Sequence, residues 1–188
     1  QYRKLSFLDG SSDYIWRSGI KHDCSQVMEF EIKDNHFVNG LGESCGIEPE
    51  MLFPLYKSSD VFHRYRTARK YVLVTQKQVG QDTIWIQRDA PKTWKYLTQH
   101  AALLDKRKSR IYRKNPRFSI FGIGNYSFSP WKIAVSGLYK KIHFSLLSPD
   151  GDGKPSMVDD TCYFIPCWDI REAQLLWDLL ALDEASAF

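Results

Sequence analysis

The stretch FSIFGIGNYSFSPWKIAVSGLYKKIHFSLL, residues 118–147, decides the fold class of this chain. Within it, short runs rich in β-branched and aromatic residues alternate with glycine and proline, a pattern typical of strands joined by turns. The run TCYFI repeats the pattern after a segment rich in aspartate and glycine. We therefore expect four strands, over residues 118–123, 132–138, 142–147 and 161–165.

Three more runs nearer the N-terminus have the composition of strands. VMEFEI covers residues 27–32, YVLVTQ residues 71–76 and TIWIQ residues 83–87. Gly80 lies between the last two runs and suits a hairpin loop. We expect these two runs to pair as a hairpin.

Two helices are expected in the first two thirds of the chain. EPEMLFPLY, residues 48–56, predicts a short helix interrupted by a proline and followed by the polar loop KSSD, residues 57–60. A longer helix is expected over residues 91–113, because Pro91 suits a first helical turn and Pro116 ends the pattern. Its apolar residues recur at helical spacing, namely Trp94, Leu97, Ala101, Leu104 and Ile111.

A last helix is expected over WDIREAQLLWDLLAL, residues 168–182. Asp169 is placed as its N-cap, with Glu172 three residues further on. Strands in the body and helices apart from them indicate an α+β fold. The helix should bury a broad apolar stripe made of Ala173, Leu176, Trp177 and Leu180.

We expect residues 1–188 to form a single domain, since no linker, repeat or low-complexity tract divides them. The first residue is Gln1 rather than methionine, which suggests an excerpt of a longer chain. Hydrophobic residues at 43% and charged residues at 26% are typical of a globular protein. No apolar run approaches the roughly 18 residues of a membrane span, so we expect no membrane partner and a cytoplasmic location. Four scattered cysteines fit a reducing compartment.

The positive charge of the chain is confined to its first part. Residues 150–188 hold nine acids against Lys154 and Arg171, which leaves residues 1–149 with an excess of eleven positive charges. A field of that sign attracts polyanions, because cations that neutralise phosphates release condensed counterions. The composition therefore favours a nucleic-acid partner.

Two segments concentrate this charge. KRKSRIYRKNPR, residues 106–117, has seven Lys or Arg and no acid, and HRYRTARKY, residues 63–71, interleaves cations with tyrosines. On the expected helix, one stripe of cations could follow a phosphate backbone, although a solvated helix end would have similar composition. The candidate DNA contacts in these segments are Arg64, Arg66, Lys106, Arg107, Lys108, Arg110, Arg113 and Lys114.

No catalytic apparatus is expected in this chain. NPRF, residues 115–118, differs from the Asn-Pro-Pro-aromatic signature of amino-methyltransferases, because Arg117 stands where the second proline belongs. The following IFGIG lacks the spacing of a glycine fingerprint, since Ser127 replaces the third glycine. A structural interpretation, with a helix stop and a glycine bulge, is preferred.

A metal-dependent nuclease is the alternative hypothesis. Glu31 and Lys33 have the local form of such a site, with Asp13 or Asp23 upstream as a further carboxylate. Zinc is not expected, because the pairs His22–Cys24 and Cys162–Cys167 lack a metal-knuckle spacing.

Five segments together resemble one protein family, in order and over most of the chain. The chain is similar to the C-terminal target-recognition (DNA specificity) domain of bacterial adenine-specific DNA methyltransferases of restriction-modification systems. The segments are WRSGIKHDCSQVMEF (16–30), PLYKSSDV (54–61), PKTWKYLTQHAALLDKRKSRIYR (91–113), FSIFGIGNYSFSPWKIAVSGLYKK (118–141) and DDTCYFIPC (159–167).

The resemblance implies that this domain reads double-stranded DNA, while a separate N-terminal catalytic domain binds S-adenosylmethionine and methylates adenine. It implies no cofactor in this segment. Phosphate contacts should position such a domain and a few polar side chains should read base edges. The resemblance places further DNA contacts at Lys57, Ser58, Ser59, Tyr126, Ser127, Trp131 and Lys132.

Overall fold

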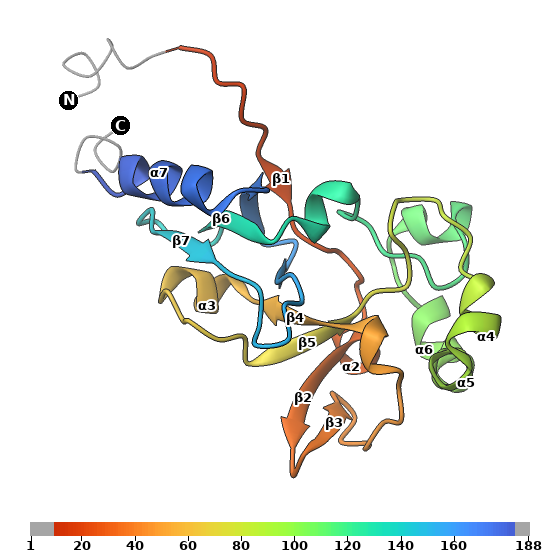
Figure 1. The fold of residues 1–188 in the computed structure, drawn as a ribbon. Helices are drawn as coiled ribbons and strands as arrows, with labels where there is room; N and C mark the ends of the chain where they lie inside the picture. Colours follow the sequence, from red (N-terminus) through yellow and green to blue (C-terminus); the bar gives the residue numbers. More distant parts are fainter. Residues whose placement is uncertain (1–9, 183–188) are drawn as a thin grey trace.

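A computed structural model describes residues 10–182 and arranges the strands in two sheets (Figure 1). The four-stranded sheet is antiparallel and has the order β1–β9–β6–β7. Its centre is the long pair β6–β9, in which Ile133 lies opposite Ile165. The bounds are β1 (Arg17–Ser18), β6 (Trp131–Ser136), β7 (Phe144–Leu147) and β9 (Cys162–Cys167).

The five-stranded sheet has the order β3–β2–β5–β4–β8. Its first four strands pair antiparallel, and β8 adds in parallel beside β4, with Leu55 opposite Met157. The chain passes directly from β8 of this sheet into β9 of the other sheet. The bounds are β2 (Glu29–Lys33), β3 (His36–Asn39), β4 (Leu52–Tyr56), β5 (Lys70–Leu73) and β8 (Met157–Val158).

The helices are short and stand apart from the strands, so the fold is α+β as the sequence predicts. In Figure 1, α7 packs on the four-stranded sheet, while α4, α5 and α6 gather beyond the end of the five-stranded sheet. The bounds are α2 (Ser25–Met28), α3 (Ser58–Phe62), α4 (Trp85–Asp89), α5 (Pro91–Gln99), α6 (Ala101–Asp105) and α7 (Ile170–Leu180), with 3₁₀ turns at Pro49–Met51, Arg110–Lys114 and Asn125–Phe128.

The C-terminal helix agrees with its expected cap and apolar stripe. The Asp169 carboxylate accepts a hydrogen bond from the backbone N–H of Arg171 at 2.6 Å, as an N-cap should. Ala173 is fully buried. Leu176, Trp177 and Leu180 pack beside it on β6, β7 and β9, which leaves the opposite side of α7 exposed.

Several expected elements are wrong. Residues 118–123 form no strand beyond one bridge at Phe121, and residues 83–87 contribute to α4 instead of pairing with β5. Residues 48–56 form a 3₁₀ turn and β4, because the apolar run enters the sheet. The expected loop at residues 57–60 begins α3.

The expected helix over residues 91–113 is interrupted twice. It breaks at His100 between α5 and α6, and α6 ends at Asp105. Residues 106–109 are irregular, and Arg110–Lys114 is a 3₁₀ turn. Helical spacing therefore holds for the apolar residues up to Leu104, but it does not extend through the basic segment.

Three backbone segments cross closely where the two sheets meet. Ile20 donates its N–H to the carbonyl of Val158 at 2.7 Å, and the backbones of Lys21 and Phe121 exchange two hydrogen bonds of 2.9 Å. Gly122 has φ +64°, and a Cβ there would lie 2.0 Å from the carbonyl oxygen of Gly19. The crossing therefore requires glycine.

No helix in residues 10–182 is both long enough and apolar enough to cross a membrane.

Replacement Gly122→Ala should destabilise the protein by more than about 2 kcal/mol, since it adds a backbone clash to a left-handed φ. The free energy of unfolding from chemical denaturation measures the effect. Gly151→Ala is the matched control, because nothing lies within 4 Å of a Cβ there. Equal stability of the two variants would contradict this account of the crossing.

Candidate nucleic-acid interface

The basic segment after α6 is exposed along most of its length. Because it is irregular and then 3₁₀, its cations do not form the single helical stripe that the sequence predicts. Arg117 pairs with Asp105, but five other exposed cations of the segment have no ion-pair partner in the part of the chain that the structure describes. These cations are Lys106, Lys108, Arg110, Arg113 and Lys114.

Arg107 differs from its neighbours, because its side chain is buried and bonded internally. Its guanidinium donates to the carbonyl oxygens of Leu104 at 2.8 Å, Ser119 at 2.7 Å and Arg117 at 2.8 Å. The same group lies over the ring of Tyr112 at 3.7 Å. Arg107 therefore holds the basic segment onto the core, and we leave it out of the interface.

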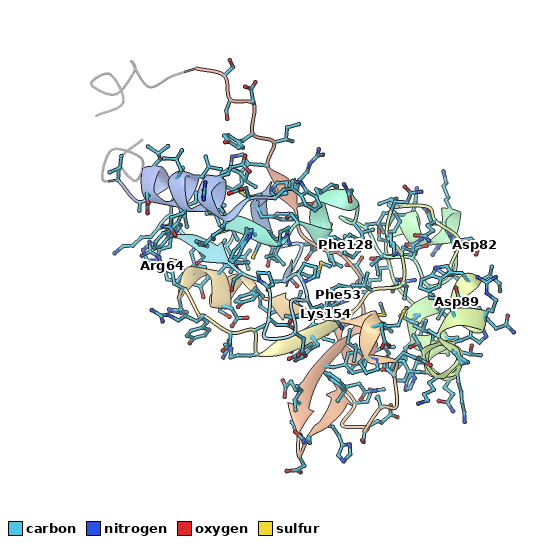
Figure 2. The ribbon with its side chains drawn as sticks, in the orientation of Figure 1. Phe53, Arg64, Asp82, Asp89, Phe128 and Lys154 are labelled. Atoms are coloured by element: carbon cyan, nitrogen blue, oxygen red, sulfur yellow. The ribbon has the colours of Figure 1, made fainter. Side chains whose placement is uncertain are left out.

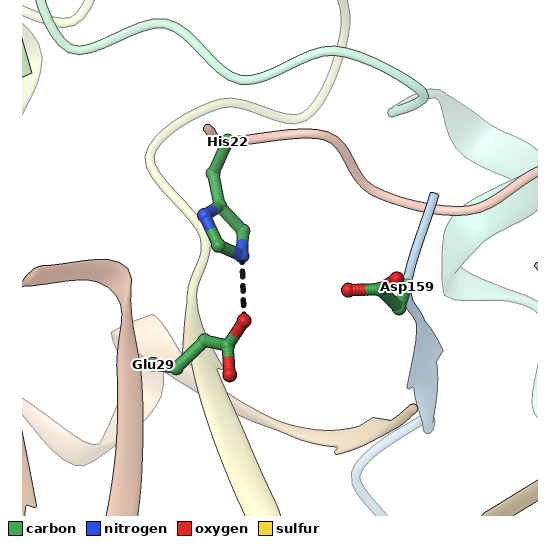
Figure 3. Close-up of side chains that lie close together, drawn as sticks. All are labelled: His22, Glu29 and Asp159. Atoms are coloured by element: carbon green, nitrogen blue, oxygen red, sulfur yellow. Dashed lines mark ion pairs between the residues drawn. The ribbon is translucent and has the colours of Figure 1, made fainter. Parts of the chain in front are cut away.

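A cleft of about 770 Å³ opens beside the basic segment, and an ionic cluster of His22, Glu29, Lys57 and Asp159 lines it. Figure 3 shows three members of this cluster, His22, Glu29 and Asp159. His22 Nε2 lies 3.3 Å from Glu29 Oε1, and Asp159 faces the pair from the loop after β8. The ammonium of Lys57 donates to Glu29 at 2.8 Å and also to Asp159. One cation thus joins two carboxylates that come from different segments.

The electrostatics of this ionic cluster favour its charged form. Burial alone would raise the pKa of Glu29, but hydrogen bonds from His22 and Lys57 outweigh it and lower the pKa to about 2. Burial would raise the pKa of Asp159 as well, but hydrogen bonds from Lys57 and Thr161 outweigh burial and lower it. Burial opposes the charge of Lys57, yet the two carboxylates raise its pKa.

Residues 57–59 thus have mainly internal partners. The side chain of Lys57 is one-third exposed but is bound to its carboxylates. Ser58 is buried, and its hydroxyl contacts that of Ser136 on β6. Ser59 is partly exposed at the start of α3, and its hydroxyl accepts one long hydrogen bond, of 3.5 Å, from Arg69.

The second expected group of contacts lies largely inside the fold. Lys132 is 1% exposed, and its ammonium donates to the carbonyl of Ser129 at 2.7 Å. Ser127 is also buried, while Tyr126 and Trp131 are half-buried. Because a buried side chain cannot reach a phosphate or a base edge, we leave Ser58, Ser127 and Lys132 out of the interface.

Burial of Lys132 has an electrostatic consequence. With no carboxylate bonded to its ammonium, desolvation lowers the pKa of Lys132 to about 7. Burial therefore destabilises the charged ammonium of Lys132 more than its neutral amine.

Arg64 and Arg66 are exposed at the end of α3, and Figure 2 places Arg64 at the edge of the molecule. Neither has an ion-pair partner among residues 10–182, whereas nearby Arg69 is paired with Asp60. The structure therefore leaves these two guanidinium groups available to a ligand.

The residues of the nuclease alternative do not gather into a metal site. Glu31 and Lys33 pair with each other at 3.5 Å on β2, and Asp23 pairs with Lys21. Among the described residues, the group able to offer three ligand atoms is His22, Glu29 and Asp159, all within 4.8 Å. The ammonium of Lys57 already stands between its carboxylates, so this donor set fits a lysine better than a divalent ion.

All four cysteines are free thiols. Cys162 and Cys167 are buried on β9 within two different apolar clusters. Cys24 donates its backbone N–H to His22 Nδ1 at 3.2 Å, which is a turn contact.

Sequence reasoning missed the ionic cluster because its members come from three distant parts of the chain: residues 22–29, Lys57 and Asp159. One signal was present, since Glu29 interrupts the apolar run of β2 at a position that the sheet buries. A buried carboxylate needs a partner, but sequence spacing could not identify Lys57 and His22 as that partner.

Comparison with known proteins supports a methyltransferase relationship. The chain is 54% identical over 164 residues to the Type II methyltransferase M.NspV of Nostoc sp. (strain ATCC 29411 / PCC 7524). The chain is homologous to part of a Type II methyltransferase. The match covers 87% of this chain and 34% of that relative, so the chain spans about a third of the length of the methyltransferase it matches.

A solved structure has a similar fold. The chain superposes on part of the Type IIL restriction-modification enzyme MmeI, determined in complex with DNA, with a TM-score of 0.58 and 13% identity. The superposition covers 91% of this chain and 21% of that enzyme, and at this identity it establishes the fold alone. No protein-family model matches the chain.

Replacement Lys57→Met should destabilise the protein by about 3–5 kcal/mol at neutral pH, because it removes the cation that two buried carboxylates share. Glu29 keeps its contact with Lys70 at 3.1 Å, whereas Asp159 has no other ion-pair partner among residues 10–182. Urea unfolding followed by tryptophan fluorescence measures the effect. Lys33→Met, which breaks an exposed pair, should cost less than about 1 kcal/mol. Similar losses in the two variants would refute a central role for Lys57.

Replacement Lys132→Met should stabilise the protein at pH 7, by up to a few kcal/mol. Between pH 7 and about 10 the unfolded chain binds the lysine proton and the folded chain does not, so wild-type stability should rise with pH there. The advantage of Lys132→Met should therefore shrink over the same window. Lys95→Met, at an exposed position, should show no such trend in unfolding measured from pH 6 to 10.

Proposed function

We propose that this chain is the double-stranded DNA recognition module of a bacterial restriction-modification methyltransferase. The observation that carries the proposal is the 54% identity to part of a Type II methyltransferase. A fold shared with part of a restriction-modification enzyme whose structure contains DNA supports it. The module reads duplex DNA and holds it for a catalytic domain elsewhere in the same protein.

The charges of the exposed surface support a polyanionic partner. Between Asp105 and Asp150 the sequence has no acidic residue. Apart from Arg117, which pairs with Asp105, the exposed cations of this stretch have no ion-pair partner among residues 10–182, and phosphate groups can supply the counter-charge. The proposed phosphate contacts are Lys106, Lys108, Arg110, Arg113 and Lys114, together with Arg64 and Arg66 after α3.

The remaining parts of the proposal concern the whole protein. Its methyl donor is S-adenosylmethionine, its target base is adenine, and its location is the cytoplasm. The sequence resemblance supports these points, and the absence of a usable donor-binding glycine motif in this chain supports a donor site in another domain. The nuclease alternative has less support, because Glu31 belongs to no group of three candidate metal ligands among the described residues.

The protein should bind duplex DNA with an affinity that falls steeply as salt rises, because counterion release drives the binding. The variant Lys106→Gln, Arg110→Gln, Arg113→Gln should bind about tenfold or more weakly to all duplexes alike. Its log–log salt slope should be smaller in magnitude by up to about 3. Fluorescence anisotropy at several salt concentrations measures both quantities.

A variant with the same loss of charge controls for general electrostatics. Lys92, Lys95 and Arg171 are exposed and unpaired among residues 10–182, and lie outside the proposed contacts. Replacing all three with Gln should change affinity only slightly. A wild-type affinity that does not respond to salt would overturn the proposed function, and equal losses in the two variants would overturn the assignment of residues 106–113.

A further inference from the structure

The turn between β6 and β7 is held to the end of α3 by a stack of three rings. Tyr139 lies on Phe62 with centroids 3.8 Å apart and planes at 8°. His143 stacks on Phe62 as well, at 4.5 Å and 10°. Two parallel rings so close to a third must lie on its opposite faces, which places Phe62 in the middle.

Hydrogen bonds add to this attachment. His143 Nδ1 lies 3.2 Å from the carbonyl oxygen of Phe62, and the hydroxyl of Ser145 donates to the carbonyl of Val61 at 2.6 Å. The two ends of the ring stack thus fix both sides of the turn, residues 137–143. A turn held in this way presents its outer side chains in a defined direction.

The outer side chains of the turn are cationic and apolar. Lys140 and Lys141 are exposed and have no ion-pair partner among residues 10–182. Leu138 is 68% exposed and Ile142 is 51% exposed, although both are large apolar residues. Exposed aliphatic side chains next to unpaired lysines are typical of a surface that binds a partner.

The segment after α3 extends this surface. Arg64 has φ +56°, a backbone conformation rare for a residue with a side chain, and its N–H donates to the carbonyl of Val61 at 3.2 Å. Arg64 and Arg66 line a pocket of about 290 Å³ together with Tyr65 and Trp177. Guanidinium groups beside aromatic rings suit phosphate and the faces of bases.

We propose that this turn, with Arg64 and Arg66, is a second DNA-contacting surface that enters the major groove of a duplex; the inference rests on the proposed function. A two-stranded β-ribbon fits the major groove. Lys140 and Lys141 contact phosphates, while Leu138 and Ile142 meet the apolar part of the groove, where thymine methyl groups lie. The ring stack positions the turn for that contact.

The surface is separate from the basic segment after α6. In Figure 1 the β6–β7 turn lies on the left, whereas residues 106–114 lie on the right beside α6. Losses of charge at the two places can therefore be measured independently. A duplex is long enough to contact both, and duplex DNA is favoured over an acidic protein because the cations flank aliphatic and aromatic groups suited to bases.

The test compares two double variants of equal charge change in the full chain. Lys140→Gln/Lys141→Gln should lower duplex affinity about tenfold, and reduce the magnitude of the log–log salt slope by about 2. Lys92→Gln/Lys95→Gln, which removes two exposed cations from α5, should change affinity less than about twofold. Both variants should keep the wild-type unfolding midpoint, since these side chains are exposed.

A third variant separates groove contact from general charge. Leu138→Ala/Ile142→Ala changes no charge, so it should leave the salt slope unchanged while altering the preference among duplexes that differ in A·T content. Equal affinity of wild type and Lys140→Gln/Lys141→Gln, with salt-dependent wild-type binding, would overturn this inference and leave the proposed function standing. Loss of salt-dependent binding in the wild type itself would overturn both.

Discussion

The ammonium of Lys57, held between the carboxylates of Glu29 and Asp159, is the interaction on which the rest of the structure depends. Lys57 follows β4, Glu29 begins β2, and Asp159 stands at the passage from one sheet to the other. Removing charges from water is costly unless they are paired and hydrogen-bonded. The three segments must therefore meet in one geometry, and the glycine crossing beside them allows their backbones to come close enough.

This internal use of cations divides the positive charge of the chain into two classes. Lys57, Arg107 and Lys132 are bonded to carboxylates or to backbone carbonyls inside the fold. The exposed cations of residues 106–114 and of the β6–β7 turn have no ion-pair partners in the described chain. Only the second class can neutralise phosphates, so the net charge overstates the charge available to DNA.

The fold explains why recognition can be separated from chemistry in this chain. Paired sheets and short helices present loops and one β-turn from a rigid base, which is the arrangement that positions polar and cationic groups against a ligand. The one buried cluster of His and carboxylate groups in the described residues already has cationic partners, namely Lys57 for both carboxylates and Lys70 for Glu29. The cluster therefore stabilises the junction of the two sheets. The cleft that it lines opens next to the basic segment.

The sequence by itself determined the α+β class, the strands β6, β7 and β9, and the C-terminal helix with Asp169 as its cap, because local composition and capping act over a few neighbouring residues. It also located the basic segment. Only the tertiary structure decided that residues 83–87 join a helix, that Leu52–Tyr56 enters a sheet, and that the basic segment leaves the helix at Asp105. These outcomes depend on which surface each run buries, and burial is set by segments distant in sequence. For the same reason, only the structure could show which lysines and arginines remain exposed to a partner.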